Sequence, residues 1–188
     1  MRWQNNLSLL QDNLVGLQVT DYQGLSIDPD EAFEMLEERT IQLRDQKRTM
    51  YLIGNGASSS MASHVSADLA KNAMLHTQVF TDLALITALA NDIAYDSVFS
   101  EPIARRMNAG DILVAISSSG QSPNILKAVD QAHQKAGFVI TLSAMNQLNS
   151  LRSKGHLNFY VPAKTYGMAE TSHNAILHHW IDIITGDA

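Results

Sequence analysis

The apolar residues of this chain repeat in two ways, and each predicts a different kind of element. From Leu7 to Leu17, leucines recur at steps of three and four, which is the spacing of an amphipathic helix over residues 1–20. After a loop through Gly24, Asp28 and Pro29 supply a cap and a first turn for a second helix over residues 29–46. Both helices precede the first predicted strand. They either pack on a partner subunit or cap one face of their own sheet.

Short apolar runs follow these helices, and we expect each to be a strand. The run at 112–116 has five apolar residues in succession, too short for a buried helix and without the alternation of a half-exposed strand. Segments of helical length and periodicity separate the runs, so we expect right-handed crossovers between parallel strands and a sheet covered on both faces. The predicted strands are 50–53, 78–80, 112–116, 138–142 and 157–161.

The central run leads into a turn rich in hydroxyl groups. Residues 117–122 read SSSGQS, and Pro123 then opens a helix for which Ser122 is a suitable N-cap. Hydroxyl groups, free backbone N–H groups and the positive end of a helix dipole together suit a phosphate dianion. The turn contains no lysine or arginine, which favours a small phosphorylated metabolite over a polyanion. An ordinary polar turn between a strand and a helix is the alternative.

A second turn of this kind follows the first predicted strand. Residues 54–60 read GNGASSS, in which Gly54 and Gly56 permit close approach or left-handed backbone, while Asn55 and Ser58 supply polar groups. Both turns follow the carboxyl ends of strands, and open parallel sheets bind their ligands at that edge. We therefore expect the two turns to form one ligand site.

The helix after the first turn carries an ionisable pair. His64 and Asp68 are four residues apart and share a face, beside an apolar ridge of Met61, Val65, Leu69 and Ala73. Such a pair can act as acid and base, form half of a metal site, or be a surface ion pair.

The last predicted helix, 169–185, is unusually rich in histidine. His173, His178 and His179 lie on or around its apolar stripe, and Glu170, Asn174 and His178 form a polar row at steps of four. A partly buried histidine with a satisfied ring is the simpler interpretation for one or two of the three.

Composition narrows the class of partner. The chain has 188 residues, which suits one domain. Its net charge of −6 argues against nucleic acid or an acidic membrane surface as the main partner. The absence of cysteine excludes disulfides and thiolate zinc sites. No apolar segment resembles a signal peptide or a membrane span, so we expect a soluble cytoplasmic protein.

Taken together, these motifs resemble the sugar isomerase (SIS) domain family, in particular its phosphoheptose isomerase branch. The resemblance rests on GNGASSS with the His64 helix, on NDIAYDSVFS, on GDILVAISSSGQSPNILKA and on the histidine-bearing last helix. It implies a single domain over 1–188, with helices for packing and oligomerisation in 1–48 and an α/β core in 49–188. The implied fold is a three-layer α/β/α sandwich with a five-stranded parallel sheet, assembled as a homotetramer with active sites at subunit junctions, with a dimer as the alternative assembly.

The resemblance also implies an activity. Members of this branch convert sedoheptulose 7-phosphate to D-glycero-D-manno-heptose 7-phosphate, toward the heptose of bacterial lipopolysaccharide. Their substrate and phosphate positions correspond to Asn55, Gly56, Ser58, Asp92, Ser117, Ser118, Ser119 and Ser122.

For catalysis, the family's histidine and glutamate pair corresponds to His64 and Asp68, and its last-helix histidine to His178. Asp68 is then the base and His178 the acid. A zinc ion held by His64, Asp68, Glu170 and His178 is also implied, with His173 as the alternative to Glu170. No nucleotide or organic cofactor is expected.

Two departures from the family keep other functions open. Aspartate at position 68 is one methylene shorter than the usual glutamate, and the family's glutamine on the last helix has no clean equivalent. The main alternative is a non-catalytic tetramer that binds phosphosugars or a protein, as a replication-initiator-associating relative does. A deaminating or amide-handling sugar phosphate enzyme is a weaker alternative, because such relatives carry a further domain.

Overall fold

Five parallel strands form the centre of the molecule. The computed structural model describes residues 2–186. Neighbouring strands pair in parallel in the order β7-β6-β5-β3-β4, so the predicted five-stranded parallel sheet is confirmed. Every residue of the central strand β5 is buried, as its unbroken apolar run predicts. The strands are β3 (Thr49–Gly54), β4 (His76–Val79), β5 (Ile112–Ser117), β6 (Phe138–Ser143) and β7 (Leu157–Tyr160).

Two further strands extend this sheet at one edge, where a loop was predicted. β1 (Gln18–Asp21) pairs antiparallel with β7, and β2 (Ser26–Ile27) pairs antiparallel with β1, so the complete sheet has seven strands. Gly24 adopts a φ of +82° in the turn between them. The loop prediction is wrong. Both strands are short and bury only Val19, so their sequence lacks the alternation of apolar and polar residues that predicts a strand.

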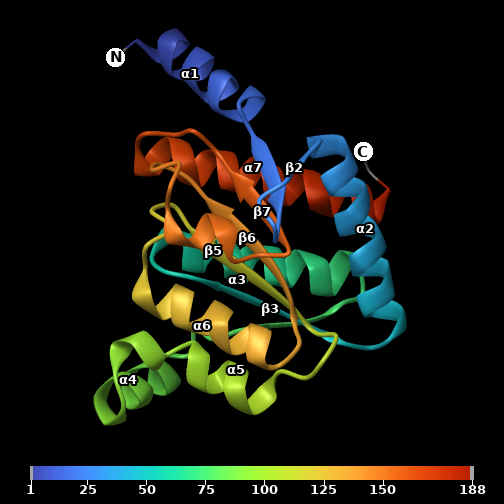
Figure 1. The fold of residues 1–188 in the computed structure, drawn as a ribbon, viewed down its shortest axis with the longest axis vertical. Coiled ribbons are helices and arrows are strands. Elements are labelled where there is room, and N and C mark those ends of the chain that lie inside the picture. Colours follow the sequence, from blue (N-terminus) through green and yellow to red (C-terminus); the bar gives the residue numbers. More distant parts are fainter. Residues whose placement is uncertain (1, 187–188) are drawn as a thin grey trace.

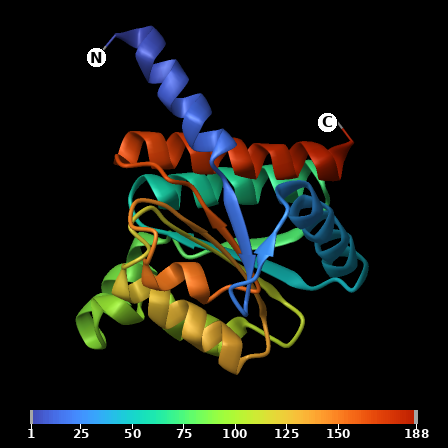
Figure 2. The ribbon, with the colours of Figure 1, turned by 45° about the horizontal axis from the view of Figure 1, so that its top comes forward.

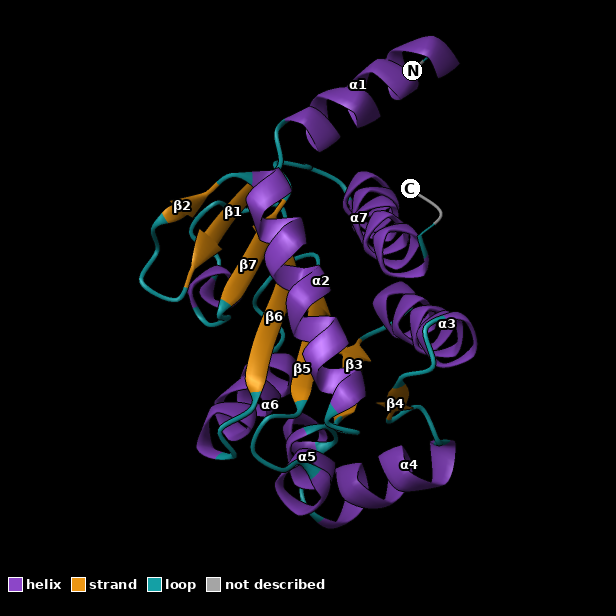
Figure 3. Cartoon of the chain, turned by 90° about the vertical axis from the view of Figure 1, so that its right-hand side faces the viewer, coloured by secondary structure: helices purple, strands orange, loops and turns teal. Residues whose placement is uncertain are grey.

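Helices cover both faces of the sheet (Figure 1, Figure 3). One face carries α2 (Pro29–Asp45), α3 (Ala57–Asn72) and α7 (Tyr166–Thr185). The other carries α5 (Ser100–Arg106) and α6 (Pro123–Gln134), with α4 (Leu83–Asp92) at the periphery beside the 3₁₀ turn η1 (Tyr95–Ser97). A second 3₁₀ turn, η2 (Ser150–Ser153), precedes β7. Residues 95–106 therefore form a 3₁₀ turn followed by a separate short helix.

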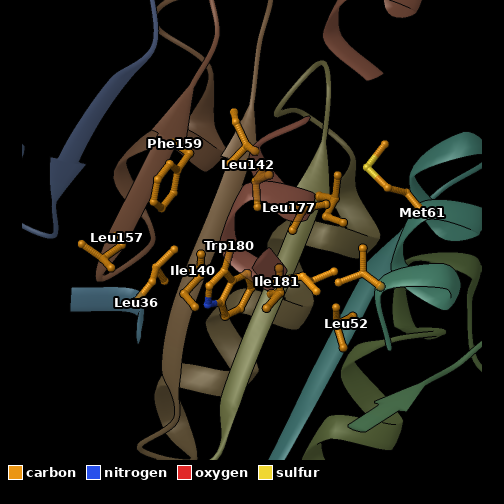
Figure 4. Packing of buried hydrophobic residues seen from close by; sticks show 14 of the residues in the cluster. Leu36, Leu52, Met61, Ile140, Leu142, Leu157, Phe159, Leu177, Trp180 and Ile181 are labelled. Carbon is orange, nitrogen blue, oxygen red and sulfur yellow. The ribbon is translucent and has the colours of Figure 1, made fainter. Parts of the chain in front are cut away.

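The larger core cluster lies between the sheet and the layer of α2, α3 and α7 (Figure 4). Trp180 of α7 is fully buried there, and its indole N–H donates to Thr40 Oγ1 of α2 at 3.1 Å. The apolar ridge predicted on α3 is buried. On α7, the residues of the predicted stripe that are buried are Ile176, Leu177, Trp180 and Ile181, and Ile184 is partly buried.

The two N-terminal helices behave differently. α2 buries Phe33 and Leu36 and so caps its own sheet. α1 (Trp3–Val15) projects beyond the sheet and contacts α7 (Figure 2). Among its residues only Asn13 is buried, while Trp3 is 70% exposed and Val15 79% exposed. Within residues 2–186, every helix is too short or too polar to cross a membrane.

Candidate functional site

The two polar turns meet in one cleft at the carboxyl ends of β3 and β5. These strands are adjacent in the sheet, with Gly54 opposite Ile116. Parallel pairing therefore places the turn after β3 beside the turn after β5, as expected. The cleft has a volume of about 160 Å³, and its lining residues are Asn55, Ser58, Ile116, Ser117, Ser118, Ser119, Ser122, Tyr166 and Glu170.

Glycines allow both turns to approach so closely. A Cβ at Gly54 would lie 2.6 Å from the carbonyl carbon of Ser58, so only glycine permits α3 to begin this near to β3. Gly120 has a φ of +61°, and a Cβ there would overlap the side-chain amide of Asn149. Asn149 in turn donates to Ser143 and Ala144, which fixes the serine turn against the end of β6.

The hydroxyl groups of the cleft have spare hydrogen-bonding capacity. Ser117 Oγ and Ser122 Oγ lie 3.3 Å apart, and Ser119 Oγ accepts the N–H of Gln121. Ser122 stands at the N-cap of α6, as predicted, but its side chain does not cap the helix. The Ser118 hydroxyl is buried and has no partner within residues 2–186. A buried hydroxyl rarely lacks a partner, and an oxygen of a bound anion would supply one.

The opposite wall of the cleft comes from the start of α7. Tyr166 and Glu170 line it, and Glu170 is partly buried. Nothing in the periodicity of the sequence indicated Tyr166 as a site residue. Glu170 was expected among the metal ligands, yet it lies beside the serines and is not one of the groups that converge on His64.

Further along the same two helices, three ionisable side chains converge. His64 Nε2 and Asp68 Oδ2 of α3 are 3.3 Å apart, and the rings of His64 and His178 of α7 lie 5.4 Å apart. One donor atom from each of the three side chains lies within 4.8 Å of the others. Two imidazole nitrogens and a carboxylate oxygen form a donor set that suits a first-row divalent metal such as zinc. Thus His64, Asp68 and His178 form a group that can hold a metal ion.

The group of His64, Asp68 and His178 and the serine-lined cleft are both built partly from α3 and α7, and these two helices lie side by side (Figure 2). His64 is six residues beyond Ser58 on α3, about 9 Å along the helix axis. His178 is eight residues beyond Glu170 on α7, about 12 Å along that axis. The serine-lined cleft and the group of His64, Asp68 and His178 are therefore separated by about the length of one extended sugar phosphate.

The other histidines of α7 lie elsewhere. His173 is fully buried, its Nε2–H donates to the Ser143 carbonyl at 3.2 Å, and burial lowers its pKa to about 4. It stays neutral at physiological pH, and it is not among the convergent ligands. The structure therefore does not place His173 with the other predicted metal ligands. His179 is exposed and contacts the Phe33 ring edge-on at 4.7 Å, on the side of α2.

Asp92 does not reach the cleft in a single chain. It ends α4, is exposed, and accepts a hydrogen bond from the side-chain amide of Asn91. Gly56 is the N-cap residue of α3 with a φ of +56°, and it shapes the first turn without lining the cleft. Asn124, fully buried at the start of α6, contacts the cleft through Asn55.

Comparisons with known proteins agree with this architecture. Residues 30–144 match the family model described as the SIS domain. The chain is 36% identical over 139 residues, 70% of each protein, to a phosphoheptose isomerase of Coxiella burnetii (strain RSA 493 / Nine Mile phase I). It is 32% identical over 162 residues, 82% of this chain and 83% of the relative, to a phosphoheptose isomerase of Shewanella denitrificans.

Solved structures show the same fold. The phosphoheptose isomerase GmhA from Neisseria gonorrhoeae superposes with a TM-score of 0.80 at 25% identity, over 96% of both chains. A phosphoheptose isomerase from Francisella tularensis superposes with a TM-score of 0.81 at 24% identity, over 99% of this chain and 100% of that one. With the family model covering more than half of its length, this chain belongs to the SIS domain family.

Proposed function

We propose that this protein is an aldose–ketose isomerase of a phosphorylated sugar, converting sedoheptulose 7-phosphate to D-glycero-D-manno-heptose 7-phosphate. The observation that carries the proposal is the pairing of a serine-lined cleft, with its unpartnered Ser118 hydroxyl, and a convergent group of two imidazoles and a carboxylate on the same two helices. Relatives that share 70% or more of their length with this chain are named phosphoheptose isomerases.

The cleft binds the phosphate in this proposal. Ser117, Ser118, Ser119 and Ser122 provide hydroxyl donors at the start of α6, where backbone N–H groups and the helix dipole also favour an anion. Asn55 and Ser58 contact the sugar chain from the turn after β3. Fixing the anionic end of the substrate orients its reactive carbons and lowers the entropic part of the barrier.

Asp68 and His178 carry out the proton transfers. Asp68 removes a proton from C1 of the ketose while His178 protonates the C2 carbonyl oxygen, which gives an enediol. The proton then returns to C2 as the C1 hydroxyl loses its own proton and becomes the aldehyde. No atoms are gained or lost overall. Each group acts once as an acid and once as a base, as general acid–base catalysis of an isomerisation requires.

His64 supports this chemistry from the same helix. Its ring nitrogen is 3.3 Å from the Asp68 carboxylate, close enough to orient it, and the Asp68 side chain is 26% exposed. As the alternative role of these three side chains, in which Asp68 and His178 bind an ion and do not themselves transfer protons, we propose that they hold zinc, because the three donors match its preferred ligands. When bound, zinc supplies a Lewis acid that stabilises an oxyanion.

A homotetramer in the cytoplasm completes the proposal. α1 and α4 expose apolar side chains that a subunit interface would cover: Trp3, Leu7, Val15 and Leu83. In α4, a helix with a largely apolar sequence, no residue is buried within the single chain. The absence of cysteine is compatible with a reducing compartment.

The test is an isomerisation assay with purified protein and sedoheptulose 7-phosphate, with and without added zinc, in which NMR detects the aldose. Asp68→Asn and His178→Gln should each abolish turnover and leave phosphosugar binding largely intact. His179→Gln, which changes the adjacent exposed histidine, is the matched control and should keep the parent rate. Parent-like turnover in both active-site variants would refute the assignment of Asp68 and His178.

The same assay addresses the non-catalytic alternative. Side chains of Asp68 and His178 that point apart would favour a protein that only binds phosphosugars or another protein. Here the donor atoms of His64, Asp68 and His178 lie within 4.8 Å of one another, which favours the enzyme. Binding of sedoheptulose 7-phosphate without conversion, under both zinc conditions, would favour the alternative.

A further inference from the structure

Two asparagine side chains, one from each polar turn, form a reciprocal amide pair at the cleft. Asn55 Nδ2 donates to Asn124 Oδ1 at 2.9 Å, and Asn124 Nδ2 donates to Asn55 Oδ1 at 2.9 Å. Asn55 follows β3 and lines the cleft, whereas Asn124 is in the first turn of α6 and only 2% exposed. Asn124 therefore reaches a ligand through Asn55 and not directly.

The surroundings select one orientation of this pair. Asn124 Oδ1 also accepts the backbone N–H of Ile125 at 3.0 Å, so its oxygen and nitrogen cannot exchange places without losing that bond. Because the amides pair reciprocally, the orientation of Asn124 determines that of Asn55. The Tyr95 hydroxyl, which donates to Asn55 Oδ1 at 3.5 Å, favours the same orientation.

Tyr95 is itself held by α6. Lys127 Nζ, one turn beyond Asn124, donates to Asp96 Oδ1 at 3.0 Å and to Ser97 Oγ at 2.8 Å. These bonds attach η1, which begins with Tyr95, to the helix that carries Asn124. The same hydrogen bond from Lys127 is the main cause that lowers the pKa of Asp96. Thus α6 positions Asn55 directly through Asn124, and indirectly through Lys127, which holds the turn that carries Tyr95.

Counting donors and acceptors shows what remains for a ligand. The Asn55 oxygen accepts from Asn124 at 2.9 Å and, in a longer contact of 3.5 Å, from Tyr95, so both groups near this oxygen are donors. Its nitrogen gives one hydrogen to Asn124, and the second N–H has no partner within residues 2–186. We propose that Asn124 is a positioning residue that makes Asn55 a pure donor, presenting one N–H to an oxygen of the phosphosugar in the cleft. This inference rests on the proposed function for its ligand.

Asn124→Asp tests the inference with little change in shape. Aspartate keeps an acceptor for the Ile125 N–H but replaces the donor to Asn55 with a second acceptor, so the oxygen of Asn55 is repelled. We expect the KM for sedoheptulose 7-phosphate to rise about 10-fold while kcat changes less than about 3-fold, since binding and not proton transfer is affected. Asn108→Asp, which adds the same charge at an exposed position, should leave both constants unchanged.

A double-mutant cycle separates positioning from a general structural effect. If Asn124 acts through Asn55, Asn55→Ala and the double variant Asn55→Ala/Asn124→Asp should have the same KM within about 2-fold. A further 10-fold rise in the double variant would overturn the inference. Tyr95→Phe, a change to an exposed side chain, should raise KM about 2-fold in the parent and not in the Asn55→Ala background.

A readout without substrate keeps this inference distinct from the isomerase proposal. In ¹⁵N-labelled protein, the Asn55 side-chain amide, assigned by its loss in Asn55→Ala, should show one slowly and one rapidly exchanging proton. In Asn124→Asp the resonances of this side-chain amide should shift, because the Asn55 oxygen loses the donor at position 124 and faces a carboxylate oxygen, while backbone signals outside the two turns stay in place. An Asn55 amide that is unchanged in Asn124→Asp would overturn the inference, whether or not the protein turns over sedoheptulose 7-phosphate.

Discussion

The Ser118 hydroxyl offers a prediction in which stability and binding change in opposite directions. Ser118 is 5% exposed, lines the serine cleft, and has no hydrogen-bond partner for its Oγ within residues 2–186. Burial of an unpartnered hydroxyl costs about 1–3 kcal/mol, and Ser118→Ala removes that cost along with one oxygen atom. We expect the free energy of unfolding without ligand to stay unchanged or to rise by about 1 kcal/mol. For a chain of this length, 1 kcal/mol raises Tm by about 2–4 °C.

Ligand binding should respond in the other direction. In the proposed complex the Ser118 hydroxyl donates to a phosphate oxygen, and a hydrogen bond to a charged group contributes about 1.5–3 kcal/mol. Ser118→Ala should therefore weaken the binding of sedoheptulose 7-phosphate about 10- to 100-fold. Calorimetric unfolding scans with and without this sugar measure both quantities, since the ligand-dependent rise in Tm reports affinity.

Ser66→Ala is the matched control. Ser66 is comparably buried and does not line the cleft, but its hydroxyl donates to Thr77 Oγ1 of β4 at 2.9 Å. This substitution should lower the free energy of unfolding by about 1 kcal/mol without affecting phosphosugar affinity. If Ser118→Ala is destabilised as much as Ser66→Ala and binds the sugar as the parent does, then the unpartnered hydroxyl is not a ligand position.

Three other predictions concern the surroundings of the cleft. Glu170→Gln removes a carboxylate from beside the serines, so sedoheptulose 7-phosphate should bind about 3- to 10-fold more tightly in calorimetric titrations, whereas the exposed Asp182→Asn should have no effect. His173 has a pKa of about 4 in the folded protein and about 6.5 in the unfolded chain, so the unfolded state binds the extra proton between these values. The stability that neutral His173 contributes is complete above pH 6.5 and falls by roughly 3 kcal/mol as the pH drops to 4. In denaturant titrations, the free energy of unfolding of His173→Gln should therefore depend less on pH over that range than that of the parent. Equal pH dependence in the two proteins would contradict the lowered pKa of His173. Gly120→Ala should lower the free energy of unfolding by more than about 2 kcal/mol, measured by urea titration, because of its positive φ and its overlap with Asn149; a parent-like midpoint would show that the turn adapts.

Much of the fold follows from local pattern in the sequence. The unbroken apolar run of β5 indicated a strand buried on both faces, and all six of its residues are buried. The steps of four on α3 indicated the buried ridge and placed His64 beside Asp68. The pairing of the two polar turns followed from parallel topology, because adjacent strands end at the same edge of the sheet.

Other features depend on contacts that no local pattern records. The β1–β2 hairpin is held by β7, which lies more than a hundred residues away in the chain. The position of Glu170 depends on where α7 crosses the end of β5, and the helical period alone placed it in a row with His178. The pairing of Asn55 with Asn124 joins residues 69 positions apart, so sequence spacing offered no signal for it.

The central claim is that the serine cleft holds the phosphate of a sugar whose carbonyl end reaches Asp68 and His178. A crystal structure of Asp68→Asn with sedoheptulose 7-phosphate tests it most directly, because this variant should bind the sugar without converting it. We predict the phosphate within hydrogen-bonding distance of Ser118 Oγ, with C1 and C2 of the sugar beside the side chains at positions 68 and 178. A phosphate bound away from residues 117–122, or sugar carbons pointing away from His178, would contradict the claim.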